Sequence, residues 1–236
     1  MQQRPMQHYK FLTSLLLAWL CCLLLAGCEQ RKTAPRAKQA ESAPTYAGTI
    51  IAAGDSLTAG LGVVQEDAWP SILQKKLAEN GLNWRVINGG ISGETSSGLQ
   101  ARSKWLQAQR PEIVILATGG NDGLRGIPPP VIRENIAQTA RLFQAGGVTV
   151  ILAGMQIVQN LGADYSSEFA AIYPAVAAEQ RCILIPFLLK GVAAEPVLNQ
   201  EDTIHPNEKG HQLIAETVYP YVLQAIQAHT RPAPLP

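Results

Sequence analysis

Two patterns of apolar and polar residues alternate along the chain from residue 48 onward. Short apolar runs rich in β-branched residues are typical of buried strands, whereas longer stretches with apolar residues every three or four positions are typical of helices. Strands are predicted at residues 49–54, 84–89, 112–120, 148–154 and 182–188. Longer helices are predicted at residues 68–81, 97–110, 131–147, 166–180 and 207–229.

Strands that alternate with helices and are apolar throughout predict a parallel sheet with helices on both faces. We therefore expect an α/β fold over residues 48–230, a three-layer α/β/α sandwich with a five-stranded parallel sheet. Residues 231–236 are expected to form a short C-terminal tail.

The start of the chain follows a different pattern. Two basic residues precede an apolar run over residues 11–25 that is short for a membrane-spanning helix and typical of an export signal. The run ends in Leu-Ala-Gly-Cys, which resembles the signal of bacterial lipoproteins, where the cysteine is lipidated and becomes the first residue. We expect a lipoprotein signal peptide at residues 1–27 and lipidation of Cys28. An ordinary cleaved signal peptide or an uncleaved anchor would also export the domain.

Residues 29–47 are polar, rich in Pro and Ala, and without apolar periodicity. With Cys28 they predict a lipidated cysteine and flexible tether over residues 28–47. The protein is therefore expected in the bacterial cell envelope, facing the periplasm, with the membrane as its partner through the lipid anchor. Glu29 follows Cys28 in place of the aspartate associated with inner-membrane retention, which favours the outer membrane.

Composition narrows the class of protein further. A chain of 236 residues with 47% hydrophobic residues suits one domain with a sizeable core. Its formal net charge of +1 argues against nucleic acid as a partner. After removal of the signal and lipidation of Cys28, only Cys182 remains, which excludes a disulfide within the domain. We expect Cys182 to be a buried, unreactive thiol, and the protein to be a monomer.

Polar residues and glycines follow the predicted strands where each one ends. Ser56 follows the first strand, Gly93 lies in a glycine-rich loop after the second, and Asn121 follows the third. Asp202 and His205 come in a loop after the fifth strand. Because ligands bind at the carboxyl edge of parallel sheets, these residues should gather at one site. Together they supply the groups that acyl transfer requires.

Each group has an expected role in such a reaction. Ser56 alone would more often be a helix cap, but His205 can activate its hydroxyl as a nucleophile. A carboxylate, from Asp202 or Glu201, can orient the imidazole ring. The backbone N–H of Ser56, the backbone N–H of Gly93 and the side-chain amide of Asn121 are candidate oxyanion donors. Asp55 and Asp122 are expected to be structural.

Four ordered segments resemble the conserved blocks of a known family. "GDSL", "ISGET", "GGNDGLRG" and "DTIHP" resemble blocks I, II, III and V of the SGNH, or GDSL, hydrolases, which have a flavodoxin-like sandwich. "AWPSIL" and "FAAIYP" resemble its periplasmic subgroup of multifunctional esterases, which includes acyl-CoA thioesterase/lysophospholipase and arylesterase. The resemblance implies Ser56 as nucleophile, completed by Asp202 and His205. It also implies Ser56, Gly93 and Asn121 as the oxyanion hole.

The expected function is therefore a serine esterase that hydrolyses small-molecule acyl esters or thioesters through a Ser-His-Asp triad and an acyl-enzyme. No cofactor is expected, and no metal, because His205 and His211 have no third ligand in view and His211 is expected at the surface. One alternative is a carbohydrate or peptidoglycan O-acetyl esterase. An alternative of another class is a non-catalytic envelope binding module, although no triad or oxyanion residue is missing.

Overall fold

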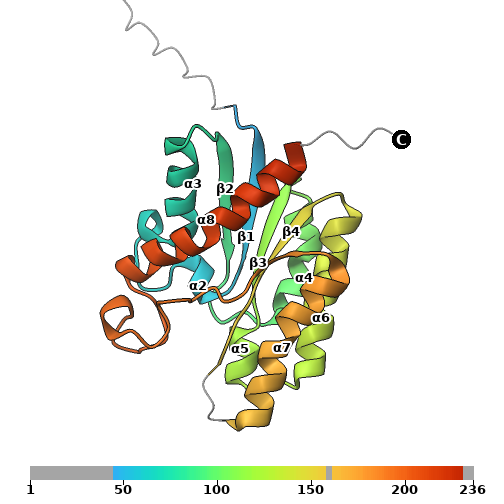
Figure 1. The fold of residues 1–236 in the computed structure, drawn as a ribbon, viewed down its shortest axis with the longest axis vertical. Helices are drawn as coiled ribbons and strands as arrows, with labels where there is room; N and C mark the ends of the chain where they lie inside the picture. The colour runs from blue at the N-terminus through green and yellow to red at the C-terminus, as the bar shows by residue number, and fades with distance from the viewer. Residues whose placement is uncertain (1–44, 158–160, 231–236) are drawn as a thin grey trace, which may run out of the picture. The chain divides into compact units, whose positions relative to one another are not determined.

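The computed structural model describes residues 45–157 and 161–230. The predicted signal peptide, Cys28, most of the predicted tether and the predicted tail at residues 231–236 lie outside these residues. The elements can be followed along the chain by colour in Figure 1.

The described residues form one five-stranded parallel sheet, as the sequence predicted. Its strand order is β2-β1-β3-β4-β5. The strands are β1 Gly48–Gly54, β2 Trp84–Gly90, β3 Ile113–Ala117, β4 Thr149–Ala153 and β5 Ile183–Ile185. The α-helices are α2 Ser56–Ala59, α3 Trp69–Glu79, α4 Ser96–Gln107, α5 Gly120–Leu124, α6 Pro129–Ala145, α7 Ala163–Gln180 and α8 Glu208–Thr230. The 3₁₀ turns η1 Gln65–Asp67 and η3 Pro196–Leu198 lie in loops between these elements.

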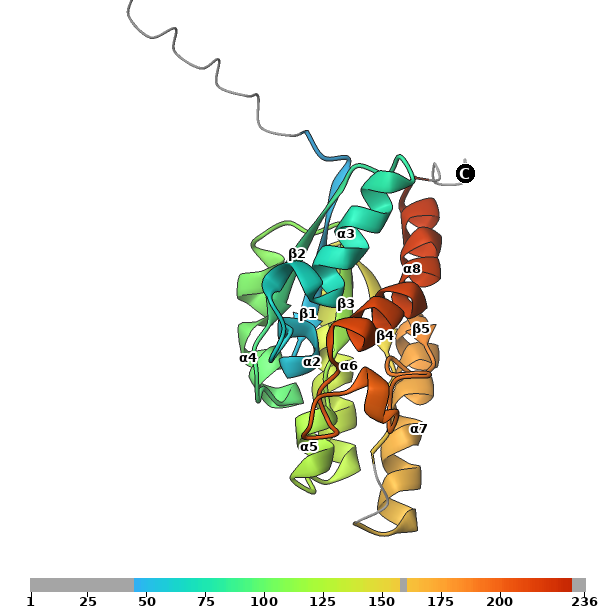
Figure 2. The same cartoon turned by 90° about the vertical axis from the view of Figure 1, so that its left-hand side faces the viewer.

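Helices cover both faces of the sheet. Helices α3 and α8 pack together against one face, and α4, α6 and α7 form a contiguous layer on the other (Figures 1 and 2). The expected three-layer sandwich is confirmed. No helix within residues 45–157 and 161–230 is both long enough and apolar enough to cross a membrane.

The burial of the central strands explains why their apolar sequence pattern identified them. Every residue of β3 is buried, and residues 50–54 of β1 are buried too, because helices exclude water from both faces. Strand β5 is shorter than predicted: it ends at Ile185, and the next residue, Pro186, has no backbone N–H to continue the ladder.

The chain turns sharply after β3. Gly119 has a φ of 103°, a left-handed conformation, and a Cβ on it would lie 2.4 Å from the hydroxyl of Tyr173. That hydroxyl donates to the carbonyl of Thr118 at 2.9 Å. Glycine is therefore required where the backbone leaves the sheet and enters α5, the short helix that carries Asn121.

Both ends of the described domain lie at the amino edge of the sheet. The chain is held before β1 by Asn83, whose carbonyl accepts from the N–H of Ala47 and whose amide donates to the carbonyl of Thr45. At the other end of the chain, the His229 ring near the end of α8 packs edge-on against Trp84, the first residue of β2.

Two expectations for single residues need correction. His211 was expected at the surface but is 1% exposed, and its Nδ1 accepts from the backbone N–H of Trp69 at 3.3 Å. It is buried because α8 packs against α3. Burial lowers the pKa of His211 to about 4. Cys182 is half-buried rather than buried, and burial raises the pKa of its thiol to about 11, which keeps it protonated at neutral pH.

We predict that His211 makes the fold less stable in mild acid. Its pKa is about 4 in the folded protein against an ordinary 6.5, so the unfolded chain binds the proton more readily. The free energy of unfolding should therefore fall as the pH is lowered from about 6.5 towards 4. The variant His211→Asn, whose side-chain oxygen can still accept from Trp69, should show a weaker fall in urea unfolding experiments.

Asp55 contributes with the opposite sign, because burial raises its pKa to about 6 and protonation then favours the folded state. Asp55 is present in both the wild-type protein and His211→Asn. The difference between the pH dependences of their free energies of unfolding therefore reports on His211 alone. Parallel profiles would contradict the prediction.

Candidate active site

The nucleophile candidate opens a short helix directly after the first strand. Asp55 is the N-cap of α2, and its carboxylate accepts from the backbone N–H of Leu57 at 3.0 Å. Ser56 is therefore the first helical residue and not the cap, which leaves its hydroxyl available to another partner. Its backbone N–H belongs to the first helical turn, where no intrahelical acceptor exists.

Ser56 contacts a histidine from the opposite end of the domain. The Ser56 Oγ lies 2.9 Å from Nε2 of His205, and Nδ1 of His205 lies 2.6 Å from Oδ2 of Asp202. The structure thus brings these three predicted residues into one chain of contacts. Asp202, and not its neighbour Glu201, is the residue in contact with the ring.

The charge state of Asp202 fixes the tautomer of the histidine. The backbone N–H and then the ring of His205, followed by the N–H of Ile204, lower the pKa of Asp202 to about 2. An ionised carboxylate only accepts, so Nδ1 of His205 carries the proton. Nε2 is left as the acceptor that faces the Ser56 hydroxyl.

The turn between Asp202 and His205 is tight. Thr203 has a φ of 63°, which is unfavourable for a β-branched residue. Asp202 Oδ1 accepts from the backbone N–H groups of Ile204 and His205, both at 2.9 Å, and these two bonds hold the turn. The carboxylate therefore shapes the backbone as well as orienting the ring.

The predicted oxyanion donors lie at the same edge of the sheet. Asn121 Nδ2 donates to the carbonyl of Glu94 at 3.0 Å and lies 3.4 Å from Oδ2 of Asp55. Its amide is thus next to the residue that follows Gly93 and to the residue that precedes Ser56. Among the hydrogen bonds of the described residues, the backbone N–H groups of Ser56 and Gly93 have no acceptor. Both remain available to a ligand.

Two buried aspartates brace this edge, in line with the structural roles expected for them. Asp55 is 2% exposed and caps α2 beside the Asn121 amide. Asp122 is 1% exposed and accepts from the backbone N–H and the hydroxyl of Ser96, at 2.8 and 2.6 Å. The second pair of bonds joins α5 to the start of α4 and so keeps the loops of Asn121 and Gly93 together.

A largely buried ion pair that sequence reasoning missed holds the Gly93 loop. Arg102 donates from Nε and Nη2 to the two carboxylate oxygens of Glu94, each at 2.6 Å, and from Nη2 to the carbonyl of Gly89 at 2.7 Å. The side chains are only 16% and 8% exposed. Bidentate geometry of this kind fixes orientation as well as distance. The pair therefore fastens the residue next to Gly93 to α4 and to the end of β2.

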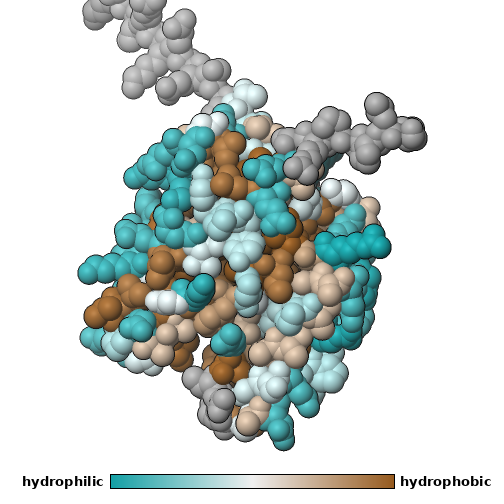
Figure 3. Space-filling view, in the orientation of Figure 1, coloured by the Kyte–Doolittle hydropathy of each residue, from teal (hydrophilic) through white to brown (hydrophobic). Residues whose placement is uncertain are grey.

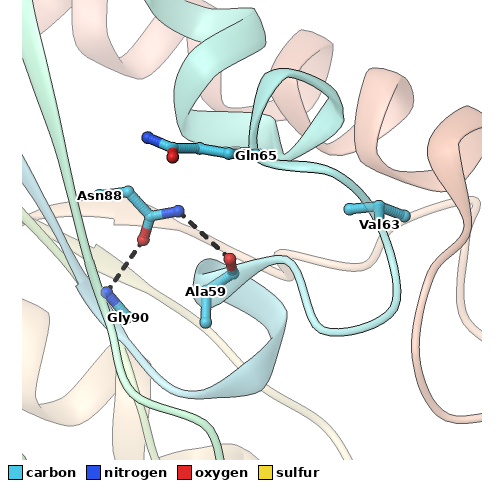
Figure 4. A pocket seen from close by; sticks show the side chains of 5 residues that line it. All are labelled: Ala59, Val63, Gln65, Asn88 and Gly90. Atoms are coloured by element: carbon cyan, nitrogen blue, oxygen red, sulfur yellow. Dashed lines mark hydrogen bonds between the residues drawn. The ribbon is translucent and has the colours of Figure 1, made fainter.

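A cavity of about 360 Å³ lies beside α2, on the side of β2. Figure 4 shows the residues that line it: Ala59, Val63, Gln65, Asn88 and Gly90. The Asn88 amide closes one wall by donating to the Ala59 carbonyl at 3.4 Å and accepting from the Gly90 N–H at 3.0 Å. None of the lining residues belongs to the Ser56–His205–Asp202 chain, although Ala59 lies in the same short helix as Ser56.

The loops at the carboxyl edge expose large apolar side chains. Figure 3 shows hydrophobic surface at the lower left, where the loops after α2 and before α8 lie in Figure 1. The exposed apolar residues include Leu61 45% and Val64 62% after α2, Ile91 49% after β2, Leu124 52% at the end of α5, Leu161 44% between β4 and α7, and Ile204 50% in the loop of His205. An apolar rim of this kind is typical of a surface that binds apolar ligands.

Comparison with known proteins gives related sequences over most of the domain. The sequence model of the GDSL-like Lipase/Acylhydrolase family matches residues 52–213. Esterase TesA of Pseudomonas aeruginosa is 41% identical over 175 residues, which cover 74% of this chain and 87% of that protein. Arylesterase of Vibrio mimicus is 38% identical over 170 residues, covering 72% and 85%. Thioesterase 1/protease 1/lysophospholipase L1 of Escherichia coli is 35% identical over 171 residues, covering 72% and 81%.

Solved structures match the fold over the same region. The crystal structure of TesA superposes with a TM-score of 0.73 at 39% identity, covering 75% of this chain and 99% of that one. The esterase EstA from Pseudoalteromonas, in a structure inhibited by monoethylphosphonate, gives a TM-score of 0.73 at 32% identity, covering 76% and 99%. The sheet and its helices are therefore shared with solved esterases.

Proposed function

We propose that this chain, which belongs to the GDSL-like Lipase/Acylhydrolase family and is an ester hydrolase, uses Ser56, His205 and Asp202 as its catalytic triad. The single observation that carries this proposal is the unbroken chain of contacts from Ser56 Oγ to His205 Nε2 and from His205 Nδ1 to Asp202. It is the arrangement that a serine nucleophile needs, with a base in reach and an acid that orients the base.

The proposed reaction proceeds through an acyl-enzyme. His205 takes the proton of the Ser56 hydroxyl as the oxygen attacks the substrate carbonyl, and Asp202 stabilises the imidazolium that forms. The tetrahedral intermediate collapses when His205 gives its proton to the leaving alcohol or thiol. His205 then activates water, which attacks the acyl-enzyme and releases the acid and the free Ser56 hydroxyl.

Three donors are proposed to hold the oxyanion: the backbone N–H groups of Ser56 and Gly93 and the amide of Asn121. Support comes from the two N–H groups without acceptors and from the position of the Asn121 amide between the neighbours of Ser56 and Gly93. Because Glu94 and Asp122 fix the loops that carry Gly93 and Asn121, these two donors are held in place before the charge of the intermediate develops.

The proposed substrates are esters or thioesters with an apolar acyl chain. The exposed apolar side chains around the carboxyl edge favour a chain longer than acetyl over a carbohydrate O-acetyl group. Relatives named arylesterase and thioesterase/lysophospholipase support the same class.

We also propose that the mature protein is a lipoprotein of the bacterial cell envelope that faces the periplasm. The support is the apolar run that ends in Leu-Ala-Gly-Cys at Cys28, followed by the polar stretch at residues 29–47. Glu29 after the cysteine favours the outer membrane.

Removal of the nucleophile tests the catalytic assignment. Ser56→Ala should lower kcat for p-nitrophenyl butyrate by a factor on the order of 10⁶, since the acyl-enzyme cannot form. The circular dichroism spectrum should not change. Ser166→Ala is the matched control, because the Ser166 hydroxyl on α7 donates to the carbonyl of Gly162, the cap of that helix, and the variant should keep full activity. Comparable turnover in the two variants would rule out Ser56 as the nucleophile.

A series of p-nitrophenyl esters from acetate to dodecanoate tests the substrate class. We expect kcat/KM to rise with chain length beyond acetate, because each methylene placed on apolar surface contributes up to about 0.8 kcal/mol of binding free energy. Strict preference for acetate would instead favour the O-acetyl esterase.

Labelling with radioactive palmitate in bacterial cells tests the proposed anchor. The full-length chain should incorporate the label and fractionate with membranes, and Cys28→Ser should do neither. Label that persists in Cys28→Ser would disprove lipidation at this cysteine while leaving the hydrolase assignment intact.

A further inference from the structure

Asp202 and His205 fix each other's orientation through short-range contacts. Their mutual contacts, from the Asp202 carboxylate to the ring and backbone N–H of His205 and to Ile204, all lie within residues 202–205. These bonds set the angle of the ring relative to the carboxylate. They do not set its distance from Ser56, which is 149 residues away in the sequence. Something else must hold the loop of His205 against the nucleophile.

Gln200 makes that connection. Its Nε2 donates to the carbonyl of Leu61 at 2.7 Å and to the carbonyl of Pro206 at 2.9 Å. Its backbone N–H donates to the carbonyl of His205 at 2.8 Å. A single side chain therefore binds the residue after the base and a residue of the loop after α2.

Leu61 is in turn bonded to the nucleophile. Its backbone N–H donates to the carbonyl of Ser56 at 3.1 Å, so the Gln200 amide is connected to Ser56 through the backbone of one residue, Leu61. Apart from the Ser56–His205 contact, the bond from Gln200 to Leu61 is the one hydrogen bond in the described part of the chain that joins residues 199–207 to residues 56–68. Within these two segments, the Gln200 bond links the two halves of the site. Beyond them, α8 is joined to α3 by the bond from the Trp69 N–H to His211 Nδ1.

The groups around Gln200 fit a glutamine side chain. Both partners of Nε2 are carbonyls, so the bridge needs a side chain that donates two hydrogens, and a glutamine amide has two. Gly62 makes room for it: with a φ of 84°, it carries no Cβ where such an atom would lie 2.1 Å from Oε1 of Gln200. The close approach and the left-handed backbone both favour glycine at this position.

We propose that Gln200 is a positioning residue, which holds His205 at bonding distance from Ser56 by bridging the carbonyls of Leu61 and Pro206. The proposal rests on the proposed roles of Ser56 and His205. Without the bridge, Asp202 and His205 keep their geometry relative to each other. The distance from His205 Nε2 to the Ser56 hydroxyl is no longer fixed. Proton transfer from Ser56 then slows, because a misplacement of about 1 Å costs up to about 10²-fold in rate.

The test compares Gln200→Leu with Gln107→Leu. Gln107 makes the same kind of bridge away from the site, from its Nε2 on α4 to the carbonyl of Leu142 on α6 at 2.9 Å. Both variants should lower the unfolding temperature by similar amounts. Only Gln200→Leu should lower kcat for p-nitrophenyl butyrate, by about 10- to 100-fold, with KM changed less than about threefold.

The rate at which a p-nitrophenyl phosphonate reacts with Ser56 gives a second readout. This reaction needs the same proton transfer to His205 but no deacylation, so Gln200→Leu should slow it by the same factor as kcat. If Gln200→Leu keeps the wild-type rate, or if Gln107→Leu loses as much, the positioning role is overturned. If Ser56→Ala remains active, it is the proposed function that fails.

A second variant reaches the same amide from the other side and serves if Gln200→Leu does not fold. Gly62→Ala places a methyl group against Oε1 of Gln200 and should lower kcat. In a Gln200→Ala background the amide is gone, so Gly62→Ala should add little further loss. Equal effects of Gly62→Ala in both backgrounds would show that the loop strain alone is responsible and would overturn the proposal.

Discussion

The parallel register of β1 with β2 and β3 is the constraint on which the site depends. Gly54 at the end of β1 pairs with Gly90 of β2 and with Ala117 of β3, so three segments leave the sheet at one level. The N–H of Ile91 extends this order by one residue through its bond to the Gly54 carbonyl. The loops of Ser56, Gly93 and Asn121 therefore leave the sheet side by side. The hydrogen bonds of Asp55, Asp122 and Glu94 then have to fix only the few residues between the strand ends and the site.

The base reaches the site by a different route. Strand β5 lies at the far edge of the sheet and ends at Ile185, well before Asp202 in the chain. The sheet register therefore does not position His205, and the loop relies on bonds within itself. The site is accordingly made of a part held by the sheet and a part held by a loop. The distance between the nucleophile and the base therefore depends on the few contacts between the two parts.

Sequence patterns predicted the sheet and the meeting of Ser56, Gly93 and Asn121, because both depend on where strands end. They did not identify Asp55 as the cap of α2, because Asp and Ser are both common caps and stand next to each other here. The burial of His211 depends on how α8 packs on α3, which periodicity within one helix does not encode. Gln200 was missed because its partners are backbone carbonyls, which carry no signature in the side-chain pattern.

The position of the two ends of the domain determines how other groups can be attached to it. Strand β1 spans seven residues, about 20 Å, between the amino edge where the chain comes in and the edge that bears Ser56. Helix α8 returns to that amino edge, where His229 meets Trp84. Fusion partners, affinity tags or a solid support can therefore be joined at either end of the domain without standing in the path of the substrate.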